Sequence, residues 1–264
     1  MKTLLDLAAQ TAVRLISFRD SLHCMAARTW SRMLILPLLV LYLLLTSATP
    51  AYAQAVSTPL TPQQVVEFAL TLEKLEAEFY RRAVIAIQSG GLVSLPDPAK
   101  NAVMSYGQDE TQHVPALSGV LTLLGGNPDA ITIPANPNFN AIIGRDPFAN
   151  PEDFLLALQN VEDTGVAAYS GQVQNLQAAG EAGKTVLAGA LEIHTVEARH
   201  AAGIRYLRQT FYGADIRPWV RNPSEVPFPK VRPGSPIPFE NEAFDGYATR
   251  DEVLAIVVPI LAGT

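Results

Sequence analysis

Glu110-Thr111-Gln112-His113 has a counterpart later in the chain, Glu197-Ala198-Arg199-His200. In each stretch a histidine follows a glutamate by three residues, and an α-helix brings side chains at that spacing onto one face. A single pair would be weak evidence for a site, but its repetition makes chance a poor explanation. The two stretches therefore predict two helices that each present a carboxylate and an imidazole together.

A second pair of glutamates lies upstream of these stretches, in segments that resemble each other. Glu73 is followed by Tyr80, and Glu162 is followed by Tyr169. Aligning the two segments superposes glutamate on glutamate and tyrosine on tyrosine, and the separation from each glutamate to the downstream pair is nearly the same. This pattern indicates a duplicated helix hairpin.

The glutamates of both halves lie on apolar helical stripes. At about 100° per residue, the face around Glu73 carries Val66 and Ala69, and the face around Glu162 carries Leu158. Burying an unpaired carboxylate is costly, so buried carboxylates are paired or bind metal. We therefore expect the carboxylates and histidines to surround metal ions. The alternatives are a surface set of salt bridges and a vestigial site.

Helical periods and capping signals predict four long helices. Thr61-Pro62-Gln63-Gln64 combines a capping residue, a proline at the first helical position and the glutamine of a capping box. Asn150-Pro151 repeats the cap and the proline before the third helix. We expect Gly180 and Gly183 to separate the third helix from the fourth. The predicted helices span about residues 61–89, 97–124, 150–179 and 185–212.

A long segment without helical period separates the second and third predicted helices. Residues 125–150 are rich in proline, asparagine and glycine but carry Ile131, Ile133, Phe139 and Phe148, which we expect to hold the segment against the bundle. A crossover of this length suits a bundle whose second and third helices run parallel, because the chain must return along a whole helix before the third begins.

The last part of the chain is expected to pack on the bundle. Residues 217–239 are rich in proline but include Trp219, Phe228 and Phe239, so they are too apolar for a free linker. A short final helix, residues 253–261, follows a capping signal at Thr249.

The two halves together match the ligand set of ferritin-like di-iron and di-manganese proteins, in which two helices each supply a glutamate and two others each supply Glu-x-x-His. The residues that carry this resemblance are Glu73, Glu110, His113, Glu162, Glu197 and His200. More narrowly, residues 59–264 resemble exported ferritin-like proteins related to plant desiccation-related proteins. The resemblance implies an all-α, ferritin-like four-helix bundle with a long crossover between helices 2 and 3, a C-terminal extension ending in a short helix, and a dinuclear site.

The resemblance also implies a role for each ligand. Glu110 and Glu197 would bridge the two metal ions, whereas Glu73 and Glu162 would be terminal ligands. The histidine of each Glu-x-x-His pair would complete one ion.

Other side chains near these faces have two interpretations each. Tyr80 and Tyr169 would orient a carboxylate across the bundle, and the alternative is plain aromatic core. His194 would be a shuttle or extra ligand near the site, or a structural histidine. Glu76 lies near the apolar arc of its helix, but Gly165 takes the matching place in the second half, so we leave Glu76 out of the site.

The N-terminus predicts export to the periplasm, a lumen or the extracellular space. Arg28 and Arg32 precede an apolar run, residues 33–45, and small residues ending in Ala51-Tyr52-Ala53, which is the plan of a secretory signal. The run is short of the roughly 20 apolar residues of a membrane span, although an uncleaved membrane anchor is the alternative. With cleavage after Ala53, the chain divides into a signal peptide at 1–53, the bundle at 54–212 and the C-terminal extension at 213–264.

The composition limits the binding partners and the metal ligands that the chain can offer. The chain has 264 residues, 48% hydrophobic, with a formal net charge of −6; it offers no basic surface for nucleic acid, which we exclude as a partner. Cys24, the single cysteine, lies in the expected signal peptide, so the mature chain would have no thiolate ligand. Carboxylate and imidazole ligands favour iron or manganese and do not distinguish between them.

Two functions follow from the expected site. In the first, two iron or manganese ions react with dioxygen or peroxide, as in ferroxidases, rubrerythrin-like peroxidases and manganese catalases, and the protein is an oxidoreductase. In the second, the bundle is a non-catalytic structural or stress-protective protein of the envelope. An iron-storage cage is a weaker third alternative, because its shell would have to accommodate the crossover and the tail. Assembly into a homo-oligomer stays open.

Overall fold

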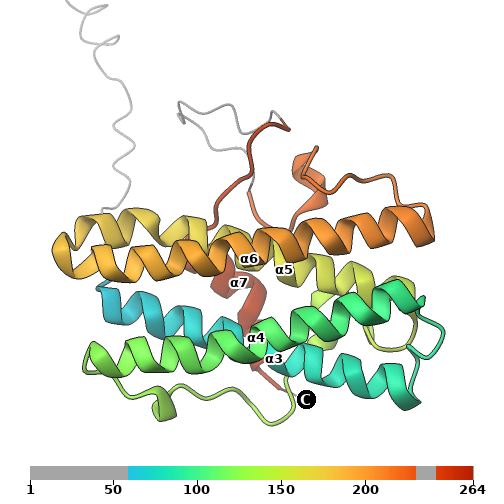
Figure 1. Ribbon diagram of the computed structural model, residues 1–264, viewed down its shortest axis with the longest axis horizontal. Helices are drawn as coiled ribbons and strands as arrows, with labels where there is room; N and C mark the ends of the chain where they lie inside the picture. The colour runs from blue at the N-terminus through green and yellow to red at the C-terminus, as the bar shows by residue number, and fades with distance from the viewer. Residues whose placement is uncertain (1–58, 230–241, 264) are drawn as a thin grey trace, which may run out of the picture. The chain divides into compact units, whose positions relative to one another are not determined.

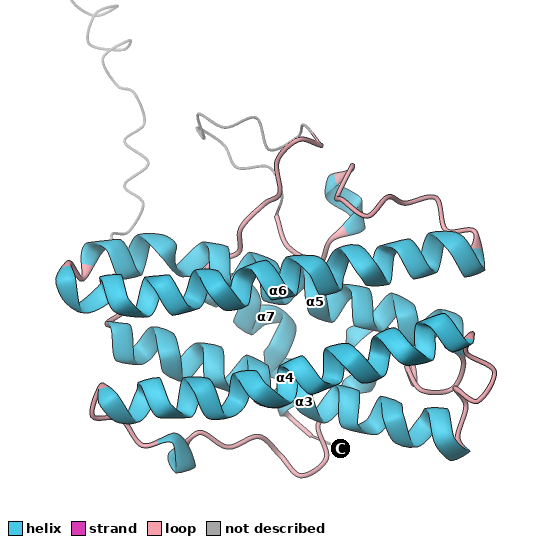
Figure 2. Ribbon diagram, viewed as in Figure 1, coloured by secondary structure: helices cyan, strands magenta, loops and turns pink. Residues whose placement is uncertain are grey.

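The described residues of the computed structural model, 59–229 and 242–263, form helices and contain no strand (Figures 1 and 2). The expected signal peptide and Phe239 lie outside them. The α-helices of this part of the chain are α3 (Pro62–Ser89), α4 (Asp97–Leu123), α5 (Pro151–Ala178), α6 (Glu181–Tyr212) and α7 (Arg250–Leu261). The all-α prediction is confirmed. Within the same residues, no helix is both long and apolar enough to span a membrane.

The capping signals at the helix starts are confirmed. Thr61 and Gln64 form both arms of a capping box, with N···O distances of 3.2 and 3.0 Å. The Asn150 side chain accepts a hydrogen bond from the backbone N–H of Asp153 at 3.0 Å. Thr249 opens α7 with a second capping box. These bonds satisfy backbone donors that have no partner inside the helix.

The prediction for the start of α6 was wrong. The helix begins at Glu181, and Gly183 lies buried in its first turn rather than breaking it. A Cβ atom at Gly183 would lie 1.8 Å from the carbonyl oxygen of Leu176. The glycine is therefore used for close packing of α6 against the end of α5. Gly180, with φ of +62°, makes the turn between the two helices.

The four long helices form two hairpins, α3–α4 and α5–α6, joined by the crossover. In Figure 1, α4 and α5 run in the same direction, so the crossover returns along the bundle as predicted. It contains two 3-10 turns, η2 (Pro128–Ala130) and η3 (Phe139–Ile142).

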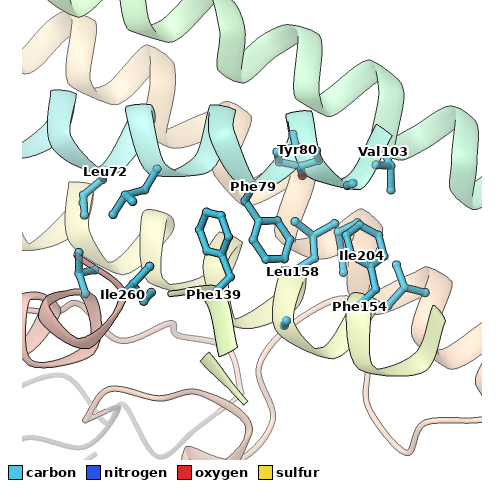
Figure 3. Packing of buried hydrophobic residues seen from close by; sticks show 14 of the residues in the cluster. Leu72, Phe79, Tyr80, Val103, Phe139, Phe154, Leu158, Ile204 and Ile260 are labelled. Atoms are coloured by element: carbon cyan, nitrogen blue, oxygen red, sulfur yellow. The ribbon is translucent and has the colours of Figure 1, made fainter. Parts of the chain in front are cut away.

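Aromatic packing holds the crossover against the bundle. Phe79 of α3 lies 5.0 Å from Phe139, 4.9 Å from Phe148 and 5.9 Å from Phe154, measured between ring centroids. Figure 3 shows Phe79 and Phe139 facing each other in this cluster. Both crossover phenylalanines therefore act as anchors, as the sequence predicted.

The C-terminal segment packs on the same core. Val253, Val257 and Ile260 of α7 are buried in the cluster around Phe79. The backbone N–H of Asn138 donates to the carbonyl of Ile260 at 2.8 Å, which joins the crossover to α7.

A buried ion pair secures the segment that follows α6. Arg205 is 1% exposed and bonds both carboxylate oxygens of Asp163, at 3.1 and 2.6 Å, as well as Glu225 at 2.8 Å. Glu225 ends the 3-10 turn η4 (Pro223–Glu225). Phe228 is buried nearby, but Trp219, which was expected to pack, is 48% exposed. Its indole N–H is bonded to Glu242, so a polar contact replaces burial there.

Candidate metal centre

The six side chains predicted as ligands meet inside the bundle. They come from all four long helices, and each is at most 8% exposed. They are Glu73 of α3, Glu110 and His113 of α4, Glu162 of α5, and Glu197 and His200 of α6.

Their nitrogen and oxygen atoms gather into two overlapping groups that could each hold a metal ion. The first contains Glu73, Glu110, His113 and Glu197, and the second contains Glu110, Glu162, Glu197 and His200. Within each group the candidate ligand atoms lie within 4.8 Å of one another. The two groups share Glu110 and Glu197.

In the first group, one imidazole nitrogen faces three carboxylates. Nδ1 of His113 lies 3.0 Å from Oε2 of Glu73 and 3.1 Å from Oε2 of Glu110. It lies 3.4 Å from Oε1 of Glu197. A single N–H cannot serve three acceptors well, whereas a cation placed among these atoms would attract all of them.

In the second group, His200 is held from its outer side. Its Nε2 lies 3.2 Å from Oδ2 of Asp109, and the ring of Tyr106 stacks on it at 4.3 Å between centroids. An N–H at Nε2 can donate to Asp109, so Nδ1 is the nitrogen that faces the interior and would be available to a metal ion. Nδ1 lies 2.9 Å from Oε1 of Glu110 and 3.5 Å from Oε2 of Glu162. His200 Nδ1 and Glu110 Oε1 are thus at ion-pair distance, although their geometry does not meet that of a hydrogen bond.

The sequence prediction missed Asp109 and Tyr106. Tyr106 stands one helical turn before Glu110, so the i, i+4 spacing could have placed it beside the site. Asp109 was harder to recognise, because its side chain is 51% exposed and reaches His200 from the rim.

Two tyrosines each form a hydrogen bond with a glutamate of the opposite helix hairpin. The hydroxyl of Tyr80 on α3 donates to Oε1 of Glu162 on α5, and the hydroxyl of Tyr169 on α5 donates to Oε1 of Glu73 on α3. Burial, followed by the nearby carboxylates, raises the pKa of both tyrosines well above the ordinary value. Both hydroxyls therefore stay protonated and act as donors.

A fifth carboxylate lies beside the six predicted ligands. Glu76 of α3, which the sequence analysis left out, is only 6% exposed. A Cβ atom at Gly165 would lie 3.1 Å from Oε1 of Glu76 and 2.8 Å from Oε2 of Glu197. The glycine that argued against Glu76 thus provides the space that Glu76 and Glu197 occupy. Burial, together with the neighbouring carboxylates, raises the pKa of Glu76 well above the ordinary value.

His194 belongs to neither group of candidate ligands. It is half-buried, and its Nδ1 has no hydrogen-bond partner among the described residues. Burial lowers its pKa below the ordinary value of 6.5.

The pKa values of the site residues show that the buried carboxylates require positive charge beside them. Burial raises the pKa of Glu73 to about 7 and raises that of Glu197 well above the ordinary value. Burial would also raise the pKa of Glu110, but close contacts with His113 and His200 outweigh burial and hold it at about 2. Burial would lower the pKa of both histidines, yet their carboxylate neighbours raise it to about 10. In the metal-free site, protons bound to these carboxylates and histidines thus provide the positive charge that metal ions would provide when bound.

Several interior atoms lack a hydrogen-bond partner, which tests whether metal would fit. These buried atoms are Oε1 of Glu110, Oε2 of Glu162, both carboxylate oxygens of Glu197 and Nδ1 of His200. Buried carboxyl oxygens without a hydrogen-bond partner are unfavourable, and a cation placed among them would compensate them. The donor set consists of carboxylate oxygen and imidazole nitrogen, which suits iron or manganese. The residues therefore fit a metal centre.

The helical bundle and its buried Glu/His cluster define a carboxylate protein with a candidate metal site. The family model of the ferritin-like domain matches residues 61–210, and the chain belongs to this family. A search of curated proteins and a search of solved structures each found no match.

Proposed function

We propose that this chain is an exported protein with a dinuclear iron or manganese centre that reacts with dioxygen or peroxide. The observation that carries the proposal is the sharing of Glu110 and Glu197 between the two groups of candidate ligands. Glu197 has neither oxygen hydrogen-bonded, as expected of a carboxylate whose two oxygens serve two ions.

Each residue then has a defined task. Glu110 and Glu197 would each help to hold both ions, because both residues belong to both groups and the two oxygens of Glu110 face different histidines. Glu73 and Glu162 are terminal ligands, and each is oriented by the hydrogen bond from a tyrosine of the opposite hairpin. When bound, the ions supply a redox pair able to exchange electrons with dioxygen or peroxide.

Small molecules have a route to this site. A depression of about 390 Å³ between α4 and α6 is lined by Tyr106, Asp109 and Arg199 and reaches both His113 and His200. It is large enough for dioxygen or peroxide and water. The half-exposed Asp109 beside His200 offers a path for protons between the rim and the site.

Metal content is the decisive measurement. Protein purified from its native compartment should contain about two equivalents of iron or manganese, and the reduced protein should consume dioxygen or peroxide. A chain that holds metal but consumes neither oxidant would have a structural centre. A chain that binds no metal at neutral pH would overturn the proposal in favour of a structural or stress-protective envelope protein, in line with the resemblance to desiccation-related proteins.

A further inference from the structure

The duplication of the helix hairpins makes the inner part of the candidate centre symmetric. Each group of ligands contains one unshared glutamate, one histidine and the two shared glutamates. A tyrosine of the opposite hairpin donates to each unshared glutamate, Tyr169 to Glu73 and Tyr80 to Glu162. Both histidines direct Nδ1 toward the carboxylates. These residues by themselves would hold two ions equally.

The outer sides of the two histidines differ. Nε2 of His200 lies 3.2 Å from Oδ2 of Asp109, and the ring of Tyr106 stacks on His200. Nε2 of His113 has neither a hydrogen-bond partner nor a stacked ring in the part of the chain that the structure describes. The side chain of His113 is also 10% exposed, against 2% for His200. Only His200 is therefore supported from outside the centre.

The sequence repeat shows what is missing behind His113. Asp109 directly precedes Glu110. In the second repeat, the residue that precedes Glu197 is Val196. Asp109 of α4 reaches the histidine of α6, so the equivalent contact would run from Val196 of α6 to His113 of α4. Both of these residues line the depression between the two helices. Because a valine side chain cannot accept a hydrogen bond, no carboxylate supports His113 from this position.

A carboxylate behind an imidazole ligand strengthens metal binding. The hydrogen bond fixes the orientation of the ring and makes the coordinating nitrogen more basic, and its loss costs roughly 10- to 100-fold in affinity. Glu76 is a second acidic residue without a counterpart in the repeat, since Gly165 takes its place. It lies beside Oε2 of Glu197, which both groups share, so it does not favour either group. The difference between the groups therefore comes from Asp109.

We propose that the centre holds its two ions unequally, tightly in the group of His200 and weakly in the group of His113, and that Asp109 and Val196 set this difference. The ion beside His200 loads first, and the ion beside His113 is the more readily exchanged. Asp109 is a positioning residue, because it acts through His200. The inference rests on the proposed function for the presence of two ions, but it concerns their binding and not their reaction with an oxidant.

Titration of the metal-free mature protein with Mn(II) tests the inequality. Anaerobic calorimetry should show two binding steps whose dissociation constants differ by about tenfold or more. Electron paramagnetic resonance should show mainly isolated Mn(II) at one equivalent and a coupled pair at two equivalents. His200→Ala should remove the tighter step, whereas His113→Ala should retain it.

Two exchanges between the repeats test the cause. Asp109→Val should weaken the tighter step about tenfold, and Val196→Asp should tighten the weaker step about tenfold, because it places a carboxylate behind His113. The matched controls are Asp97→Val on α4, where the side chain is 89% exposed, and Leu191→Asp on α6, where the residue is 45% exposed. Solvent and salt screen charges at such positions, so the controls should change each step by less than about twofold. Circular dichroism verifies that every variant is folded.

The inference is overturned if the two ions bind the wild type with indistinguishable affinities. It is also overturned if Asp109→Val weakens both steps equally, or if Val196→Asp leaves the weaker step unchanged. Two equally bound ions that still react with dioxygen or peroxide would reject the inequality and leave the proposed function intact. Unequal binding by a chain that consumes neither oxidant would support the inequality and reject the proposed reaction. A chain that binds no metal overturns both.

Discussion

The hydroxyl of Tyr169 donates to Oε1 of Glu73, although the two residues are 96 positions apart. This bond uses one oxygen of Glu73 and leaves Oε2 facing His113 at 3.0 Å. The tyrosine thus selects which oxygen is available to a metal ion.

Replacing Tyr169 with phenylalanine should therefore weaken metal binding about tenfold, the lower end of the usual cost of losing such a partner. Calorimetric titration of metal-free protein with Mn(II) measures the affinity. Tyr206→Phe is the matched control, because Tyr206 is 55% exposed on α6. Equal affinities for the Tyr169 variant and the wild type would show that the hydrogen bond does not position Glu73.

Gly165→Ala should disturb the centre through sterics. The added methyl group would meet Oε2 of Glu197 at 2.8 Å, so the shared carboxylate must move and binding of both ions should weaken. Gly119→Ala is the control, because nothing lies within 4 Å of the added atom. It should stabilise α4 by up to about 1 kcal/mol without changing metal affinity. Normal metal affinity in the Gly165 variant would mean that Glu197 does not act as assigned.

Glu110→Ala should abolish both metal binding and any consumption of dioxygen or peroxide, because Glu110 belongs to both groups of candidate ligands. Glu152→Ala, at an exposed position in the first turn of α5, should retain both. Metal analysis and oxidant consumption are measured on the same samples. If the two variants lose activity equally, the activity resides elsewhere.

The stability of the metal-free protein should fall as pH rises. The pKa of Glu73 is raised from 4.5 to about 7, so the folded state holds a proton that the unfolded state releases. Its stabilising effect is complete below pH 4.5 and is lost as pH rises through about 7. His113 and His200, raised from 6.5 to about 10, act with the same sign up to about pH 10.

Metal ions should reverse this trend, because they bind the deprotonated ligands. The difference in melting temperature between Mn(II)-loaded and metal-free protein should therefore widen from pH 5 to pH 8. Thermal unfolding under anaerobic conditions, with and without chelator, provides both curves. A difference that narrows over this range would contradict the assignment of the six ligands.

Export remains a prediction about residues outside the described part of the chain. Cleavage after Ala53 should leave a mature protein beginning at Gln54. Intact-mass measurement of the envelope fraction distinguishes this product from a full-length chain, which would support the membrane-anchored alternative.

The sequence predicted the long helices, apart from the start of α6, and the glutamates and histidines of the candidate site. Capping boxes and helical periods act over a few residues, so Thr61, Asn150 and Thr249 could be recognised as helix starts without tertiary information. The repeated Glu-x-x-His spacing likewise depends only on helical geometry.

Only the tertiary structure determined how the helix faces that carry the site residues come together. Glu76 is part of the buried cluster because Gly165, on another helix, has no side chain to occupy its space. Asp109 reaches His200 only once α4 and α6 lie side by side. Such contacts join residues distant in sequence, so their geometry depends on packing across the bundle and leaves no local periodic signal.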